Sequence, residues 1–354
     1  MKNLRNKKKI FKILKVSIFF SFVGFVLFQM FFGNYFVLGE MFLYDSVPKY
    51  NFQTSNFYSD NQNEYAESVD VYNESYQEIE VAGKNDITIY DGQVANNGKI
   101  DISKLRNISE LRKNFYIVDG RTMMTKDYFD VDKFVSTDLK IKPNGDFPKV
   151  LIFHTHSHEM FKDSDTNNLY DGIVGAGERL KQRLEERGIK CIHNTDRFDV
   201  VDGKTKILGA YERMEAPIRK ILADNPSIEI VIDLHRDGID ENKKLVTKIN
   251  GKQVAKIMFF NGICRILKDG KLQETEGLTN PYVQSNLAFS FNLASKAKEK
   301  YPNFIRGIYV NAYRYSLHFM PKSTLIEIGA QNNTKEEVFN AVDLLADVIY
   351  DVVG

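Results

Sequence analysis

Short apolar runs alternate with segments of helical periodicity from residue 149 to the end of the chain. The runs have the length of buried strands, and they cover residues 149–154, 189–193, 228–234, 254–261 and 324–328. Helical spacing covers residues 172–187, 210–223, 285–300 and 334–353. Apolar strands separated by amphipathic helices are typical of an α/β fold, with a mostly parallel twisted sheet flanked by helices on both faces.

The N-terminal pattern is different and predicts a membrane anchor. Residues 16–33 carry no charge, and as a helix they would span about 27 Å, close to the thickness of a bilayer core. Seven basic side chains precede this run within residues 1–15, which predicts a cytoplasmic N-terminus. Residues 34–39 are bulky and lack a small-residue cleavage pattern. We therefore expect one uncleaved N-terminal transmembrane helix, giving single-pass localisation at the cell membrane with the remainder of the chain outside the cytoplasm.

Composition and charge narrow the class of protein. The chain has 354 residues, of which 43% are hydrophobic and 27% charged, as in globular proteins. Two cysteines are too few for a disulfide framework. The formal net charge is +1, and it becomes −6 without the basic residues of the N-terminal tail. No domain-wide basic field is left, so a nucleic-acid partner is excluded.

The same patterns divide the chain into segments. Between residues 45 and 80 there are eight acidic residues and one lysine, with no sustained apolar period, which indicates a flexible spacer. A helical signal at 102–113 and a strand signal at 115–118 follow. The predicted organisation is a basic tail (1–15), an anchor (16–33), an acidic spacer (34–100), a preface (101–145) and a main domain (146–354).

Histidine and glutamate side chains gather at predicted strand ends. Three of the six histidines lie within residues 154–159, HTHSHE, directly after the first strand of the main domain. His235 ends the strand IVIDLH, and Glu327 lies near the end of the strand TLIEI. Because chemistry in open α/β sheets sits at the carboxyl ends of strands, we expect these side chains to meet at one edge.

This combination predicts a catalytic zinc site. Zinc in such sites takes three imidazole or carboxylate ligands and keeps one position for water. His156 and Glu159 can reach one ion from a tight turn, and His235 supplies a third ligand from another strand. A free carboxylate beside the metal can act as general base, and Glu327 suits that role.

Other residues near these strand ends have open roles. His154 competes with His156 as first ligand, and a spacing of two would place both on one side if the strand continues. The residue that is not a ligand would support the other. Asp233 lies two residues before His235 and is a candidate partner for its ring. Arg236 or His154 is expected to stabilise the oxyanion that forms when water adds to a polarised carbonyl group.

Three motifs in order resemble the stage II sporulation protein P family. They are VLIFHTHSHEMF, then VIDLHRDG, then STLIEIGAQNNTKEE, and the resemblance covers residues 115–351. It implies a zinc-dependent N-acetylmuramoyl-L-alanine amidase that removes stem peptides from peptidoglycan, with endopeptidase activity on cross-links also attributed to the family. The implied role is septal wall thinning and engulfment during endospore formation. The implied partners are the stage II sporulation proteins D and M.

Carried over by motif, the resemblance assigns zinc to His156, Glu159 and His235, and catalysis to Glu327. Other cell-wall amidases place the ligand glutamate farther beyond the first histidine, and on that pattern Glu178 is the alternative to Glu159. The motifs are also similar, more distantly, to zinc carboxypeptidases. A wall-binding module and an assembly scaffold are further alternatives, although neither role needs a metal.

Overall fold

The computed structural model describes residues 76–79, 88–92, 100–141 and 145–354. All of them belong to one unit, residues 52–354. The predicted tail and anchor, and most of the predicted spacer, lie outside the described residues.

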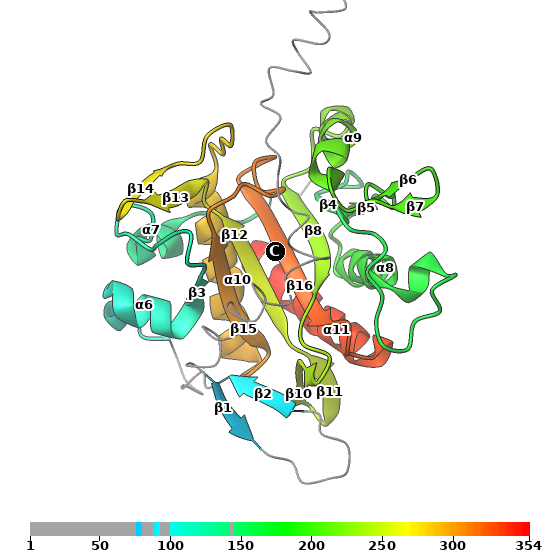
Figure 1. Cartoon of the computed structure of the whole chain (residues 1–354), viewed down its shortest axis with the longest axis horizontal. Helices are drawn as coiled ribbons and strands as arrows, with labels where there is room; N and C mark the ends of the chain where they lie inside the picture. The colour runs from blue at the N-terminus through cyan, green and yellow to red at the C-terminus, as the bar shows by residue number, and fades with distance from the viewer. Residues whose placement is uncertain (1–75, 80–87, 93–99, 142–144) are drawn as a thin grey trace, which may run out of the picture. The chain divides into compact units, whose positions relative to one another are not determined.

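A seven-stranded sheet forms the centre of this unit (Figure 1). Its strand order is β3-β15-β12-β16-β8-β4-β5. The strands are β3 (Tyr116–Val118), β4 (Val150–Phe153), β5 (Cys191–His193), β8 (Ile230–Asp237), β12 (Ile257–Gly262), β15 (Ile305–Asn311) and β16 (Lys322–Ala330). Neighbouring strands are parallel except β12 and β16, which are antiparallel. The carboxyl ends of β4, β8 and β16 therefore meet at one edge, together with the amino ends of β12 and β15.

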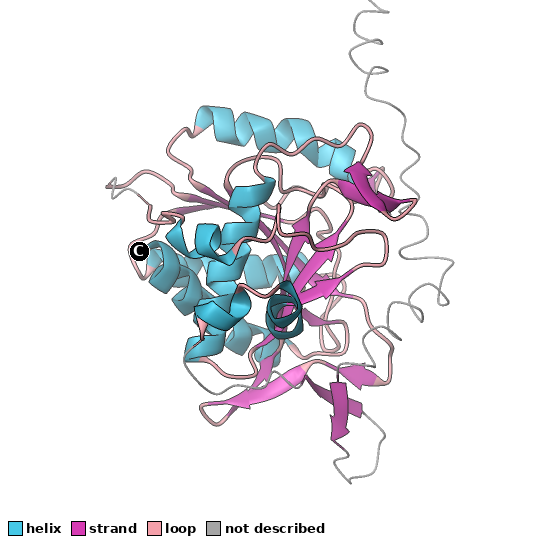
Figure 2. Cartoon of the chain, turned by 90° about the vertical axis from the view of Figure 1, so that its left-hand side faces the viewer, coloured by secondary structure: helices cyan, strands magenta, loops and turns pink. Residues whose placement is uncertain are grey.

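Helices cover the two faces of the sheet unequally. Figure 1 shows α10 and α11 behind the central strands, and Figure 2 shows most helices on one side of the sheet. The helices are α5 (Ile102–Leu105), α6 (Ile108–Phe115), α7 (Val131–Ser136), α8 (Ile173–Glu185), α9 (Ala210–Asp224), α10 (Val283–Lys300) and α11 (Lys335–Val353). A short 3-10 helix, Leu169–Asp171, precedes α8.

Apolar cores on the two faces of the sheet follow from the alternation of side chains along the strands. Ile230 and Ile232 of β8 join the main core, which also contains buried residues of α8, α10 and α11. Val231 of β8 points the other way and packs with Met214 and Ile218 of α9. The sequence pattern therefore places α9 on the face opposite the other long helices, and this second face carries the candidate site.

The described residues also form one three-stranded sheet and three two-stranded sheets. They are β1 (Tyr76–Ile79), β2 (Thr88–Gly92) and β9 (Lys243–Lys244); β10 (Val246–Ile249) and β11 (Lys252–Ala255); β13 (Arg265–Lys268) and β14 (Lys271–Glu274); and β6 (Val200–Val201) and β7 (Lys204–Thr205).

The α/β class and the mostly parallel sheet agree with the sequence pattern, and several details differ. Residues 101–145, predicted as a preface, supply β3 and three helices that pack on the main core. The predicted strand 254–261 is divided between β11 and β12. The strand β15 was not predicted, because Arg306 and Gly307 interrupt its apolar run.

The predicted fold class also included a transmembrane helix, and this part is corrected. Within the part of the chain that the structure describes, no helix combines the length and the apolar character needed to cross a membrane. The two longest, α10 and α11, carry four and six charged side chains, respectively. The same finding corrects the predicted single-pass membrane localisation. The predicted anchor itself, residues 16–33, lies outside the described residues.

Candidate active site

The HTHSHE turn and the end of β8 bring three predicted ligands into one buried corner. His156, Glu159 and His235 are 7%, 2% and 3% exposed. Glu159 Oε1 lies 3.5 Å from His235 Nδ1. The imidazole rings of His156 and His235 meet edge to face, with their centroids 5.2 Å apart.

Asp233 determines how the His235 ring is oriented. His235 Nε2 donates to Asp233 Oδ1 at 2.8 Å, and Thr155 donates to the same carboxylate from its backbone N–H and its hydroxyl. The other ring nitrogen, Nδ1, is directed at Glu159. Burial opposes a charge on His235, but the carboxylates of Asp233 and Glu159 raise its pKa well above the ordinary value.

The neighbouring groups have the protonation that metal ligands require. Burial lowers the pKa of His156 to about 4, so its imidazole is neutral near pH 7. Burial opposes ionisation of Glu159, but the charge of His235 lowers its pKa. Glu159 Oε2 accepts from the backbone N–H of Arg236 at 2.9 Å, while Oε1 has no hydrogen-bond partner among the described residues.

The spacing of the donor atoms can be compared with that of a zinc site. Two ligand atoms, each about 2.1 Å from a tetrahedral ion, are about 3.4 Å apart, and Glu159 Oε1 and His235 Nδ1 are separated by 3.5 Å. The chemistry of this pair therefore fits zinc. In the described residues, however, no group of three or more His, Cys, Asp or Glu side chains is arranged to hold a metal ion. Zinc dependence stays a prediction.

Glu327 lies beside this corner, in register with His235 on the adjacent strand. Its Oε2 is buried and accepts no hydrogen bond from a described residue. Burial, followed by the charge of Asp237, raises the pKa of Glu327 to about 8. Arg306 donates to Asp237 at 2.5 Å from the amino end of β15, and its charge partly offsets this rise.

His154 and Glu178, the alternative metal ligands that the sequence left open, lie in a separate cluster. His154 is fully buried, with Nδ1 2.7 Å from Leu234 O and Nε2 2.9 Å from His193 Nε2. His193 in turn bonds Glu178 at 2.9 Å. This cluster packs on α8 at Gly177, whereas His156 contacts Tyr211 of α9. The structure thus groups His154 with Glu178, and His156 with Glu159.

Arg236 is engaged with its own loop. Its Nε donates to Met160 O and its Nη1 to Asp237 O, each at 3.2 Å. These hydrogen bonds, together with the one from the Arg236 backbone N–H to Glu159, connect the end of β8 to the HTHSHE turn.

The sequence did not predict a role for Asp199, which lies in the connection between β5 and α9. It forms hydrogen bonds to the HTHSHE turn, called the ligand turn below. Asp199 is fully buried and accepts from the Ser157 hydroxyl at 2.7 Å. It also accepts from the backbone N–H of His158 at 3.1 Å and from His158 Nδ1. Burial opposes its ionisation, but the His158 and Ser157 hydrogen bonds lower its pKa well below the ordinary range. No local motif marks Asp199, because its partners lie about 40 residues earlier.

A row of aromatic rings, which the sequence also did not predict, lies next to His156. Tyr211, in the first turn of α9, meets His156 edge to face with centroids 5.8 Å apart. Tyr315 meets Tyr211 at 5.7 Å and Phe260 of β12 at 4.6 Å. These residues come from a helix start, a loop and a strand, so no sequence period connects them.

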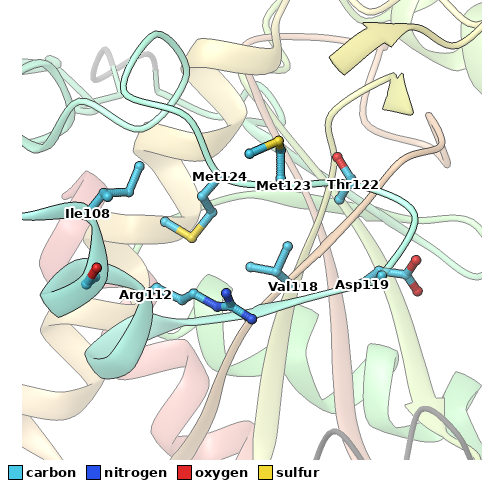
Figure 3. Close-up of a pocket in the computed structure, with 9 residues that line it drawn as sticks. Ile108, Arg112, Val118, Asp119, Thr122, Met123 and Met124 are labelled. Atoms are coloured by element: carbon cyan, nitrogen blue, oxygen red, sulfur yellow. The ribbon is translucent and has the colours of Figure 1, made fainter. Parts of the chain in front are cut away.

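A cavity of about 250 Å³ lies elsewhere, between α6 and the segment after β3 (Figure 3). Its lining includes Ile108, Arg112, Val118, Met123 and Met124. None of the predicted catalytic or metal-binding residues lines it.

Comparison with known proteins places these features in context. The family model described as Stage II sporulation protein P (SpoIIP) matches residues 40–350. The stage II sporulation protein P of Bacillus subtilis (strain 168) is 23% identical over 223 residues, which are 59% of this chain and 52% of that protein. The chain therefore spans about half the length of this curated relative.

Solved structures of amidases are also similar at low TM-scores. The CwlD amidase of Clostridioides difficile, in complex with the GerS lipoprotein, gives a TM-score of 0.35 at 18% identity, covering 57% of this chain and 94% of that one. The N-acetylmuramoyl-L-alanine amidase AmiC2 of Nostoc punctiforme gives 0.32 at 14% identity, covering 60% and 97%.

Proposed function

The chain belongs to the Stage II sporulation protein P family, and from this premise we propose that it is a peptidoglycan hydrolase acting in sporulation. The bond that we assign to it is the amide between N-acetylmuramic acid and the first L-Ala of the stem peptide. One observation carries the proposal. A buried imidazole–carboxylate pair, His235 and Glu159, lies beside a carboxyl group, Glu327, whose pKa is about 8.

The proposed cofactor is Zn²⁺, held by His156, Glu159 and His235. When bound, zinc supplies an activated water and polarises the amide carbonyl. The chain prepares these ligands in three ways. Asp233 holds the Nε2 proton of His235, the Arg236 N–H holds Glu159, and burial keeps His156 neutral.

Glu327 is the proposed general base. A carboxylate with a pKa near the working pH accepts a proton from the attacking water and can then release it. It delivers that proton to the departing amine of L-Ala as the carbon–nitrogen bond breaks. The products are the free lactyl carboxyl group of muramic acid and a stem peptide with a free amino terminus.

The test uses the full chain with purified peptidoglycan, with and without a chelator, followed by analysis of the released fragments. We expect stem peptides beginning at L-Ala, lost with chelator and restored by zinc. Glu327→Gln should still bind zinc and should release no peptide. Full turnover by Glu327→Gln would remove Glu327 from the mechanism.

The same assay separates the remaining alternatives. Fragments cut within cross-links identify endopeptidase activity, and release of C-terminal amino acids identifies a carboxypeptidase. Binding to intact wall without any cleavage, with or without zinc, identifies a wall-binding module or a scaffold. We further propose the stage II sporulation proteins D and M as partners, because they accompany this family. Repeating the assay on glycan strands already cut by a lytic transglycosylase tests dependence on the first of them.

A further inference from the structure

Tyr315 has a backbone conformation that is unusual for its residue type. Its φ is +53°, in the left-handed region that residues with a bulky side chain rarely adopt. Such a conformation is strained and persists only where the surroundings impose it. The surroundings of Tyr315 therefore show what holds it in place.

The loop that carries Tyr315 is packed directly on β12. A Cβ at Gly262 would lie 2.9 Å from Arg314 O and 2.9 Å from Tyr315 Cδ2, so the loop requires glycine at this position. Three residues after Tyr315 in the chain, His318 Nε2 lies 2.8 Å from Glu215 Oε2 of α9. The loop is thus held from two elements, and these contacts maintain the strained residue.

The Tyr315 ring lies on the sheet face that carries the candidate site. It packs between Tyr211, which contacts His156, and Phe260 of β12. Phe260 is paired with Leu325, two residues before Glu327 on β16. The charge of Glu327 is among those that act on the Tyr315 phenol.

The phenol is available as a hydrogen-bond donor. Burial raises the pKa of Tyr315 above its ordinary value, so the hydroxyl keeps its proton throughout the neutral range. The hydroxyl makes no hydrogen bond to any described residue. The two residues expected to stabilise an oxyanion are engaged elsewhere, His154 with Leu234 O and His193, and Arg236 with loop carbonyls.

We propose that Tyr315 is a further catalytic residue, whose hydroxyl donates a hydrogen bond to the oxygen of the scissile carbonyl as negative charge develops on it. The step adds no covalent bond, because the phenol proton stays on Tyr315 throughout. The inference rests on the proposed amidase function. The left-handed backbone then has a purpose, since it belongs to the loop that holds the ring between Tyr211, which contacts His156, and Phe260.

The experiment compares Tyr315→Phe with the wild-type chain on a soluble muramoyl peptide. Loss of one oxyanion donor lowers kcat by about 100-fold or more, and we expect that loss with KM, zinc content and thermal midpoint unchanged. Tyr309→Phe is the matched control. Its hydroxyl lies on the same face but bonds Asp119 at 2.7 Å, and its kcat should equal that of the wild type.

Each outcome has one meaning. If the wild-type chain releases no stem peptide, the proposed function fails. If it is active and Tyr315→Phe keeps its kcat, only the role of Tyr315 is refuted. A lower thermal midpoint together with a raised KM would identify a purely structural role and also overturn the proposal.

Discussion

Replacing Asp199 with asparagine tests how the ligand turn is held. The carboxylate accepts three hydrogen bonds, from the Ser157 hydroxyl and from two N–H groups of His158. An amide keeps one acceptor oxygen, so at least one hydrogen bond to a charged group is lost, at about 1.5–3 kcal/mol. The amide N–H₂ also faces a donor in a fully buried position. We expect Asp199→Asn to lower the free energy of unfolding by about 2–4 kcal/mol.

Equilibrium unfolding in urea measures this difference, and Asp196→Asn is the matched control. Asp196 lies on the same connection but is exposed and contacts Asn194, so its substitution should change stability by about 0.5 kcal/mol or less. If Asp199→Asn behaved like this control, the turn would not depend on Asp199.

The pH dependence of the same difference provides a second check. The folded state holds the pKa of Asp199 below its ordinary value of 3.8. A carboxyl group of this kind stabilises the fold fully above its unfolded pKa, and the contribution is lost as the pH falls through the folded value. The difference in free energy of unfolding between the wild type and Asp199→Asn should therefore be constant near neutral pH and should decrease below about pH 3.8. A difference that grew on acidification would refute the reasoning.

Three further predictions concern the same corner. Asp233→Asn should weaken zinc binding by about 10–100-fold in competition with a chelator, because the His235 ring loses its orienting carboxylate; unchanged affinity would contradict this role. With Glu327 as the proposed ionised base and its pKa at about 8, kcat should fall about tenfold for each pH unit below that value and level off above it. A rate independent of pH between 6 and 8 would contradict the proposed role. Gly262→Ala should displace the Tyr315 loop and lower kcat although the phenol is still present, which steady-state kinetics with a circular-dichroism check of folding would establish.

The fold class and the gathering of His and Glu side chains were predictable because both follow from short-range patterns. Apolar runs and helical periods identify most of the parallel strands and their helices. The position of His235 at the end of an apolar run places it at the edge of the candidate site without knowledge of the tertiary structure. The antiparallel pairing of β12 with β16 has no such signature, and neither does the insertion of β15 beside β12.

The pairing of site residues was less accessible to sequence reasoning. A spacing of two placed His154 and His156 on one side only if the strand continued, and β4 ends at Phe153. Beyond that point the chain turns, and the two imidazoles contact different helices. Asp199 and Tyr315 lie in loops and contact residues that are distant in the sequence. Their roles depend on packing contacts, which leave no periodic trace.

The lengths of the strands have a consequence for association between chains. β8 and β16 at the centre have eight and nine residues, whereas the two edge strands, β3 and β5, have three each. An exposed edge can recruit a strand from another molecule through its unpaired backbone groups, and a short edge offers few of them. The sheet therefore narrows to borders that are poor templates for β-aggregation.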